Sequence, residues 1–207
     1  MIPHLVLATR NPHKVGELRK ILLDGNPDLA AALVGVTDLP TLGMDDPGDV
    51  IETGVTFAEN ALLKARSVAR CSGLSAVADD SGLCVGVLGG APGVFSARWA
   101  GRHGDDRANL DLLLAQLSDV PDEYRAAWFT CAAALVTADG EEHVTEGRLT
   151  GTLLRAPRGD GGFGYDSVLQ PEGETRSCAQ LSPAEKNAIS HRGRAFRALL
   201  PRLLTAL

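Results

Sequence analysis

Residues 5–22 of the chain, LVLATRNPHKVGELRKIL, have the pattern of a short strand followed directly by a helix. The apolar run from Leu5 to Ala8 is typical of a buried strand. Asn11 is a favourable helix N-cap, and Pro12 suits the first helical position because an N–H there would make no intrahelical bond. Apolar residues then recur at helical spacing and can bury one face: Val15, Leu18, Ile21 and Leu22.

The same alternation of strand and helix continues through the first half of the chain. A second strand is expected over Ala32 to Val36, and a loop over Pro40 to Glu52. Thr56 and Glu59 form a capping-box pattern that begins a helix reaching about Cys71, with Gly73 as its stop. The next predicted elements are a strand from Ser75 to Ala78, which ends in Asp79-Asp80-Ser81-Gly82, and a helix from Asp106 to Leu117. This order predicts a mixed α/β fold.

The second half of the chain has a different pattern. Asp139-Gly140 lies between two strand-like stretches, Arg125 to Thr137 and Glu142 to Leu154, and predicts an antiparallel hairpin. A glycine-rich loop from Gly159 to Gly164 precedes a predicted strand at Tyr165 to Leu169. The last predicted elements are a capped helix that starts at Ser182 and a helix from about Arg192 to Leu204. We find no repeat and no long linker, so residues 1–207 are predicted to form one domain.

Composition excludes several classes of protein. The chain has 207 residues, of which 44% are hydrophobic and 22% charged, so extensive disorder, collagen and coiled coil are unlikely. Apolar runs are too short for a membrane helix. The formal net charge is −6, which does not favour loose binding to nucleic acid or to an anionic membrane. Any phosphate binding is therefore expected at a local, preorganised site.

The N-terminus and the cysteines carry less information. Residues 1–8 lack a basic region and meet polar Thr9 too soon for a signal peptide, so a cytoplasmic location is expected. Four cysteines lie in or beside apolar stretches, without the spacing of a zinc site or a disulfide framework. They are predicted to be buried free thiols: Cys71, Cys84, Cys131 and Cys178.

The turn from the first strand into the first helix is a candidate anion site. Free N–H groups and the positive helix end point the same way there. Polar and basic side chains supply further donors over Thr9, Arg10, Asn11, Pro12, His13 and Lys14. The alternative interpretation is an ordinary capped helix with an exposed lysine.

The Asp79-Asp80-Ser81-Gly82 stretch follows an apolar strand, where open sheets place ligand sites. Two carboxylates suit Mg²⁺, which takes one or two carboxylates and keeps several waters. One of them could also act as general base toward water. The alternative interpretation is a turn, because aspartate, serine and glycine are all common in turns.

Two further segments could bind a nucleoside. Phe163-Gly164-Tyr165-Asp166 follows the glycine-rich loop and offers an aromatic ring for base stacking, although core packing is the commoner role of such residues. Lys186, His191 and Arg192 lie between the last two helices and are either solvated charges or donors to phosphate and a base carbonyl. The segments together describe a site for a magnesium nucleotide.

Six motifs, in the same order along the chain, carry a resemblance to a known family. They are 7–14 (Leu-Ala-Thr-x-Asn with Lys14), 52–65 (Glu-Thr-Gly-x-Thr-Phe-x-Glu-Asn-Ala with Lys64-Ala65), 78–83 (Ala-Asp-Asp-Ser-Gly-Leu), 89–98 (Gly-Gly-Ala-Pro-Gly with Ser96-Ala97-Arg98), 162–166 (Gly-Phe-Gly-Tyr-Asp) and 181–193 (Leu-Ser-x-x-Glu-Lys-x-x-Ile-Ser-His-Arg-Gly). With these motifs the chain resembles the noncanonical purine nucleoside triphosphate pyrophosphatases, also called inosine triphosphate pyrophosphatases or XTP/dITP diphosphatases.

The resemblance implies a fold, a reaction and an assembly. The fold would be an elongated, two-lobed α/β structure around a central mixed sheet with flanking helices and a substrate cleft between the lobes. The protein would be a homodimer. The reaction would be Mg²⁺-dependent hydrolysis of ITP, dITP or XTP to the monophosphate and pyrophosphate, which clears deaminated purines from the nucleotide pool.

The resemblance also implies roles for individual residues. Asp80 would activate water and bind Mg²⁺ together with Glu52, and Ser81 would touch the substrate. Thr9 to Lys14 would hold the triphosphate. The nucleoside end would be bound by Phe163, Gly164, Tyr165, Asp166, Lys186, His191 and Arg192.

The sequence departs from the family pattern at Arg10 and His13, where many relatives carry glycine, and at Ser167, where proline is usual. Arg10 either extends positive charge toward phosphate or is surface variation. Other functions also remain as alternatives: a pyrophosphatase for other nucleotides, a nucleotide sensor without catalysis, and a nucleic-acid-binding module. The His191-Arg192 pair argues against a pyrophosphatase for other nucleotides. The carboxylates of Glu52, Asp79 and Asp80 argue against a sensor, and the acidic net charge argues against a nucleic-acid-binding module.

Overall fold

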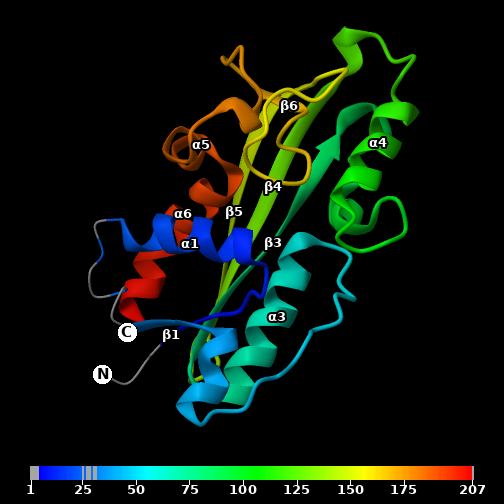
Figure 1. Ribbon diagram of the computed structural model, residues 1–207. Coiled ribbons are helices and arrows are strands. Elements are labelled where there is room, and N and C mark those ends of the chain that lie inside the picture. Colours follow the sequence, from blue (N-terminus) through cyan, green and yellow to red (C-terminus); the bar gives the residue numbers. More distant parts are fainter. Residues whose placement is uncertain (1–4, 25, 27–28, 30–31, 207) are drawn as a thin grey trace. The chain divides into compact units, whose positions relative to one another are not determined.

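The structure is a computed structural model that describes residues 5–24, 26, 29 and 32–206 (Figure 1). A mixed sheet has the strand order β2-β1-β3-β4-β5-β6. Strand β1 is parallel to β2 and to β3, whereas β5 and β6 are antiparallel. The strands are β1 (Leu5–Leu7), β2 (Leu33–Gly35), β3 (Ser75–Val85), β4 (Ala126–Val136), β5 (Glu142–Leu153) and β6 (Leu169–Pro171). The predicted mixed α/β class is confirmed.

The helices begin at the predicted caps. The Asn11 side chain accepts the N–H groups of His13 and Lys14, and the Thr56 hydroxyl accepts that of Glu59. Gly73 ends its helix in the left-handed conformation, as expected of a C-terminal glycine. The α-helices are α1 (Pro12–Leu23), α3 (Phe57–Ser72), α4 (Asp106–Gln116), α5 (Pro183–Ile189) and α6 (His191–Thr205). In the described residues, none of them is both long and apolar enough to cross a membrane.

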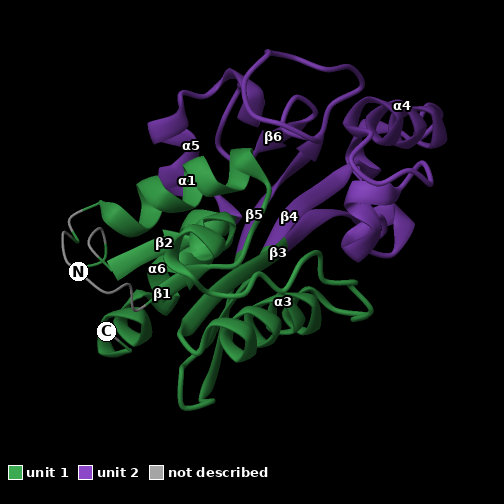
Figure 2. Ribbon diagram, turned by 60° about the horizontal axis from the view of Figure 1, so that its bottom comes forward, with its two compact units in different colours: residues 1–80, 131–147, 192–207 green, residues 81–130, 148–191 purple. Residues whose placement is uncertain are grey.

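The chain forms two compact units (Figure 2). Unit 1 contains residues 1–80, 131–147 and 192–207, and unit 2 contains residues 81–130 and 148–191. Strands β3, β4 and β5 each contribute residues to both. The prediction of a single domain over residues 1–207 stays a prediction.

Unit 1 buries both faces of its strands because successive residues of a strand point to opposite faces. Leu5 and Leu7 of β1 pack with α1 and α6, and the intervening Val6 packs with α3 on the other face. Figure 1 shows α1 and α6 on one side of β1 and α3 on the other. Strand β1 therefore lies in the middle of three layers, with α1 and α6 on one face and α3 on the other.

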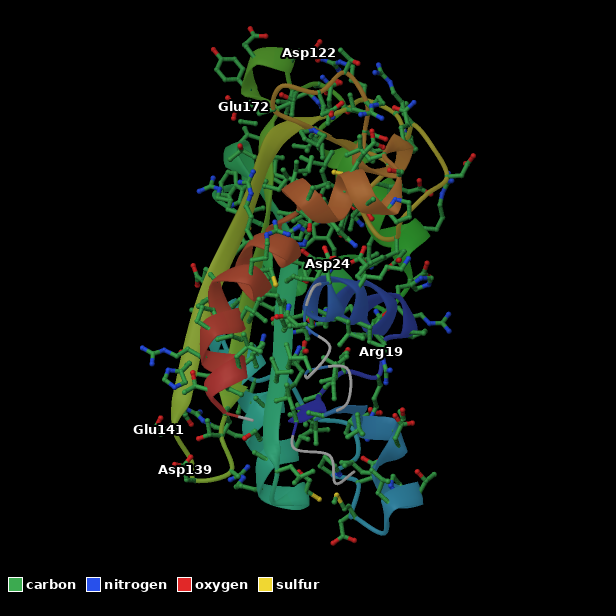
Figure 3. The ribbon with its side chains drawn as sticks, turned by 90° about the vertical axis from the view of Figure 1, so that its left-hand side faces the viewer. Arg19, Asp24, Asp122, Asp139, Glu141 and Glu172 are labelled. Atoms are coloured by element: carbon green, nitrogen blue, oxygen red, sulfur yellow. The ribbon has the colours of Figure 1, made fainter. Side chains whose placement is uncertain are left out.

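Unit 2 packs α4 against the ends of the long strands. Leu110, Leu113 and Leu117 of the α4 region contact a cluster that contains Leu83 of β3 and Leu149 of β5. The hairpin predicted at Asp139-Gly140 joins β4 to β5 at the other end, in unit 1, where the Thr137 N–H donates to the Glu141 carbonyl. Figure 3 shows Asp139 and Glu141 at this turn.

Three predicted boundaries are wrong. Strand β3 does not end at Ala78 but continues to Val85, so Asp79-Asp80-Ser81-Gly82 lies inside a strand. Its parallel partner β1 ends opposite Val77, and β4 is the neighbour along which it continues. Residues 165–168 form a turn rather than a strand, closed by the Val168 N–H donating to the Tyr165 carbonyl. Pro40, predicted to begin a loop, lies in the 3-10 helix Val36–Leu42.

The cysteines are free thiols, as predicted. Cys84, Cys131 and Cys178 are buried, whereas Cys71 is only partly buried and donates to the carbonyl of Asp45. Burial raises the pKa of the Cys178 thiol to about 12, and the nearby Asp166 charge adds to this effect. The Cys178 thiol is therefore protonated at neutral pH.

Arg125 is a buried arginine that ties together three carbonyl groups of unit 2. Its guanidinium donates to Leu117, Leu153 and Leu154 at 2.6, 2.9 and 3.1 Å. We expect Arg125→Met to lower the free energy of unfolding by about 3 kcal/mol, because buried carbonyls lose their donors. Urea unfolding followed by circular dichroism measures this.

Arg155 provides the matched control for that change. It also contacts two carbonyls and a carboxylate, of Ser118, Val120 and Asp122, but its side chain is 52% exposed. Arg155→Met should therefore change stability by less than about 1 kcal/mol, since water replaces the lost partners. An equal effect of both substitutions would contradict the role given to Arg125.

Candidate active site

Asp79 and Asp80 lie side by side in β3 and point to opposite faces of the strand. Asp79 faces the α1 and α6 side, where Lys14 and Arg192 contact it. Asp80 faces the α3 side, where Asn60 and Lys64 contact it. The two carboxylates lie just beyond the end of β1. The Ala8 N–H donates to the Val77 carbonyl of β3, and the chain then turns away into α1. All these residues belong to unit 1, and we call them, with Glu52, the aspartate cluster.

Asp79 is a fully ionised anchor. Its Oδ2 lies 3.1 Å from the Lys14 Nζ and 3.2 Å from the Arg192 Nε, and the residue is 1% exposed. Burial alone would raise the pKa of Asp79, but the charges of Lys14, Arg192 and Lys64 outweigh it and hold that pKa well below its usual range. Arg192 is further paired with Glu17 of α1.

The pKa of Asp80 is shifted in the opposite direction. Its Oδ2 accepts a hydrogen bond from the Asn60 Nδ2 at 3.1 Å, and its Oδ1 lies 3.3 Å from the Lys64 Nζ. Burial raises the pKa of Asp80, and this effect exceeds the lowering by the charges of Lys64 and Lys14. A carboxylate with a raised pKa is better suited to accept a proton than a neighbouring carboxylate with a lowered pKa.

Lys64 connects the two predicted metal ligands. Its ammonium lies 2.7 Å from the Glu52 Oε1 and 3.3 Å from the Asp80 Oδ1. Burial lowers the pKa of Lys64, but the charges of Asp80 and Glu52 outweigh it and raise that pKa. Asn60 and Lys64 belong to the motif at residues 52–65, but the sequence alone assigned no role to either residue. Their spacing of four residues, which places both on one face of α3, was the available signal.

A divalent cation fits the carboxylates in the aspartate cluster. Among the described residues, no group of three or more His, Cys, Asp or Glu is arranged to hold a metal. Glu52 and Asp80 nevertheless share one cation, the Lys64 ammonium, between their oxygens. Mg²⁺ needs no more than one or two carboxylates when water and phosphate oxygens complete its shell. These two residues therefore fit the ion that the sequence implied.

The predicted anion site lies at the start of α1 in the same unit. The Thr9 hydroxyl accepts the Asn11 N–H at 3.3 Å, Pro12 occupies the first helical turn, and His13 is exposed. Lys14 reaches back to Asp79. Arg10, in contrast, is paired with Asp46, and its Nε lies 3.3 Å from Asp49, so its charge is directed to the loop before Glu52.

Unit 2 brings together most of the predicted nucleoside-binding residues. The Lys186 Nζ lies 2.6 Å from the Asp166 Oδ2 and 5.3 Å from the centre of the Phe163 ring. Asp166 also accepts the Phe163 N–H, which closes the turn around Gly164. A side chain on Gly162, whose φ is +73°, would collide with the Asp166 carboxylate. Phe163, Asp166 and Lys186 form what we call the Phe163 cluster.

The remaining predicted residues are held separately. Tyr165 is buried and its hydroxyl donates to the Ser96 carbonyl at 2.9 Å. His191 is 5% exposed and stacks on Phe129 with ring centres 4.8 Å apart. Ser81 follows Asp80 in β3 and is partly exposed. Arg192, predicted to bind the nucleoside, makes its ion pairs with Asp79 and Glu17 within unit 1.

Comparison with known proteins gives a consistent result. Residues 5–202 match the model of the Ham1 family. The chain is 67% identical over 197 residues to a dITP/XTP pyrophosphatase of Streptomyces avermitilis, which covers 95% of each chain. It is 56% identical over 203 residues to a dITP/XTP pyrophosphatase of Mycobacterium tuberculosis, covering 98% of this chain and 96% of that protein.

Solved structures agree with the sequence matches. A nucleoside-triphosphatase / dITP/XTP pyrophosphatase of Mycobacterium abscessus superposes with a TM-score of 0.75 at 52% identity, covering 97% of this chain and all (100%) of that one. A HAM1 protein of Coxiella burnetii superposes with a TM-score of 0.84 at 39% identity, covering 99% and 100% of the two chains.

Proposed function

The chain belongs to the Ham1 family, and we propose that it is a nucleoside triphosphate pyrophosphatase that hydrolyses dITP, XTP and ITP to the monophosphate and pyrophosphate with Mg²⁺. The names of its relatives support the class of reaction and of substrate. The aspartate cluster supports the mechanism. By this reaction the protein would remove deaminated purine nucleotides from the precursor pool.

The observation that carries the proposal is the geometry of two adjacent aspartates, with Lys14 and Arg192 at Asp79 and with Asn60 and Lys64 at Asp80. The Asp79 pKa is held low by Lys14 and Arg192, while burial raises the Asp80 pKa. Pairs of carboxyl groups whose environments separate their pKa values mark acid–base sites. A protein that only bound nucleotides would have no use for a buried carboxylate tuned to accept a proton.

In the reaction, Asp80 takes a proton from the attacking water as the water oxygen bonds the α-phosphorus. The bond from that phosphorus to the bridging oxygen breaks, and the electron pair leaves with pyrophosphate. Lys14 and Lys64 stabilise the negative charge that grows on the phosphate oxygens, aided by the N–H groups at the start of α1. Glu52 and Asp80 would hold Mg²⁺, which supplies further positive charge to the same oxygens.

The nucleoside end is assigned to the Phe163 cluster and, on the strength of the resemblance, to His191 and Arg192. The partly buried Phe163 ring offers a stacking surface, and the Lys186 ammonium beside it carries a donor. His191 and Arg192 are proposed to donate to the purine 6-oxo group. Adenine would present a 6-amino group there, which leaves donors unpaired at a cost of roughly 1–3 kcal/mol.

We expect the purified protein with Mg²⁺ to release pyrophosphate from ITP roughly 10- to 100-fold faster than from ATP. Pyrophosphate and orthophosphate should be assayed separately, with a chelator control that removes the metal and stops turnover. Orthophosphate as the direct product would mean cleavage at the terminal phosphate and a different mechanism. Tight binding of ITP without any product would favour the alternative function, a nucleotide sensor without catalysis.

The assembly and location stay predictions within this proposal. The homodimer is implied by the resemblance, and the cytoplasmic location is expected from the sequence pattern. We take the region from Gly89 to Trp99 as a candidate dimer surface, and it exposes the apolar Phe95 side chain at 53%.

A further inference from the structure

Asn60 is a fully buried polar residue on α3 that links Asp80 of the aspartate cluster to the loop that carries Glu52. It is 0% exposed. Its Nδ2 donates to the Asp80 Oδ2 at 3.1 Å, and its Oδ1 accepts the N–H of Gly54 at 2.8 Å. Gly54 lies two residues after Glu52. One amide side chain therefore contacts Asp80 directly and the backbone that carries Glu52.

The chemistry of the partners sets the orientation of this amide. A carboxylate only accepts hydrogen bonds and a backbone N–H only donates, so the nitrogen of Asn60 must face Asp80 and the oxygen must face Gly54. Aspartate in place of Asn60 could still accept from Gly54 but could not donate to Asp80 as a carboxylate. The two contacts can thus be separated by an isosteric substitution.

The loop before α3 depends on such contacts for its position. Residues 44–54 carry neither helix nor strand in the described chain, and side-chain contacts such as that of Asn60 with Gly54 contribute to the position of this segment. A Cβ on Gly54 would lie 2.6 Å from the Asn60 Oδ1 and 2.7 Å from the Glu59 Cβ. The glycine thus allows the loop to approach α3 closely enough for the hydrogen bond to form.

We propose that Asn60 is a positioning residue for the pyrophosphatase reaction. By holding Oδ2, it turns the other oxygen of Asp80 toward Lys64 and fixes the direction from which Asp80 meets water. By holding Gly54, it sets the distance of Glu52 from Asp80. This inference rests on the proposed function, because it assigns Asn60 to the same reaction.

The test compares Asn60→Asp and Asn60→Ala with a matched control, Asn109→Ala. Asn109 is an equally buried asparagine of α4 whose Oδ1 accepts the Ala100 N–H at 2.7 Å, in unit 2 and outside the aspartate cluster. The readouts are kcat and KM for ITP, thermal unfolding, and hydrogen exchange at the Gly54 amide.

Asn60→Asp is expected to lower kcat on the order of 100-fold, because a misdirected base loses its attack geometry. KM should change by less than about threefold, and Gly54 should stay protected from exchange. Asn60→Ala should lower kcat at least as much and should speed Gly54 exchange about tenfold or more. Asn109→Ala should lose thermal stability as Asn60→Ala does and keep the wild-type kcat.

The results separate the two proposals. If the wild-type protein hydrolyses ITP and Asn60→Asp keeps its kcat, the role of Asn60 is overturned while the proposed function stands. Equal losses of kcat in Asn60→Ala and Asn109→Ala would also overturn it, since general destabilisation would then explain both. A wild-type protein without turnover would refute the proposed function, and Gly54 exchange would still report whether Asn60 holds the loop.

Discussion

Asp80→Asn is expected to reduce the turnover of ITP on the order of 10³-fold or more without unfolding the protein. Asparagine keeps the shape of the side chain but cannot take a proton from water, and general bases contribute about 10²- to 10⁴-fold to rate. Loss of one negative charge also weakens the electrostatic attraction of Asp80 and Glu52 for a cation placed between them. Pyrophosphate release at saturating ITP and Mg²⁺ measures the effect.

The stability of the same variant provides an independent check. Because the folded-state pKa of Asp80 is raised by burial, its ionised form is less favourable in the folded protein than in the unfolded chain. The stability that Asp80 contributes is therefore present below its unfolded pKa of about 3.9 and declines as pH rises through the folded pKa. At neutral pH, Asp80→Asn should melt at the wild-type temperature or above it. A clear loss of stability together with lost turnover would point to misfolding and would weaken the case for a base.

Asp79→Asn is expected to have the opposite signature, a loss of about 3–5 kcal/mol in the free energy of unfolding. The substitution removes the carboxylate that the partly buried Lys14 and the buried Arg192 share and leaves Arg192 paired with Glu17, and breaking a buried ion pair from one side costs about this much. Chemical denaturation at neutral pH measures it. Stability equal to that of Asp80→Asn would contradict the division of roles between the two residues.

The pH dependence of stability sharpens this second prediction. The folded-state pKa of Asp79 is lowered, chiefly because Lys14 and Arg192 outweigh the effect of burial. Its contribution is therefore present above the unfolded pKa of about 3.9 and is lost as pH falls toward the folded value. Wild-type protein should lose stability more steeply than Asp79→Asn when pH is lowered from about 5. Parallel curves for the two proteins would mean that Asp79 is not the anchor.

Much of the fold could be predicted from short-range patterns. The caps at Asn11, Thr56 and Ser182 began helices where expected, because a capping side chain bonds N–H groups two or three residues away. The turn at Asp139-Gly140 joined two strands for the same local reason. The candidate residues Asp80, Glu52 and Lys14 were found through motifs, and the structure places them in one unit.

Other features could not be predicted from local patterns. The Asp79-Asp80-Ser81-Gly82 stretch has the composition of a turn, yet it lies in β3, beside β4, a strand about 50 residues later in the chain. Residues 165–168 were predicted to begin a strand but form a turn, in which the Asp166 carboxylate accepts the Phe163 N–H. For the Asp79-Asp80-Ser81-Gly82 stretch, long-range pairing outweighs local propensity, and for residues 165–168 a side-chain contact holds the turn.

The amino-acid sequence by itself determined the family, the mixed α/β class, the helix starts and the identity of the reactive residue types. The resemblance pointed to Asp80 as the base, but only the tertiary structure shows how the surroundings of the two neighbouring aspartates differ. Asp79 and Asp80 differ in nothing but the face of β3 on which they lie. One face meets Lys14 and Arg192, which come from both ends of the chain, while the other meets Asn60 and Lys64 of α3. Because the field at a carboxylate is set by charges and burial in three dimensions, its pKa is a property of the folded protein.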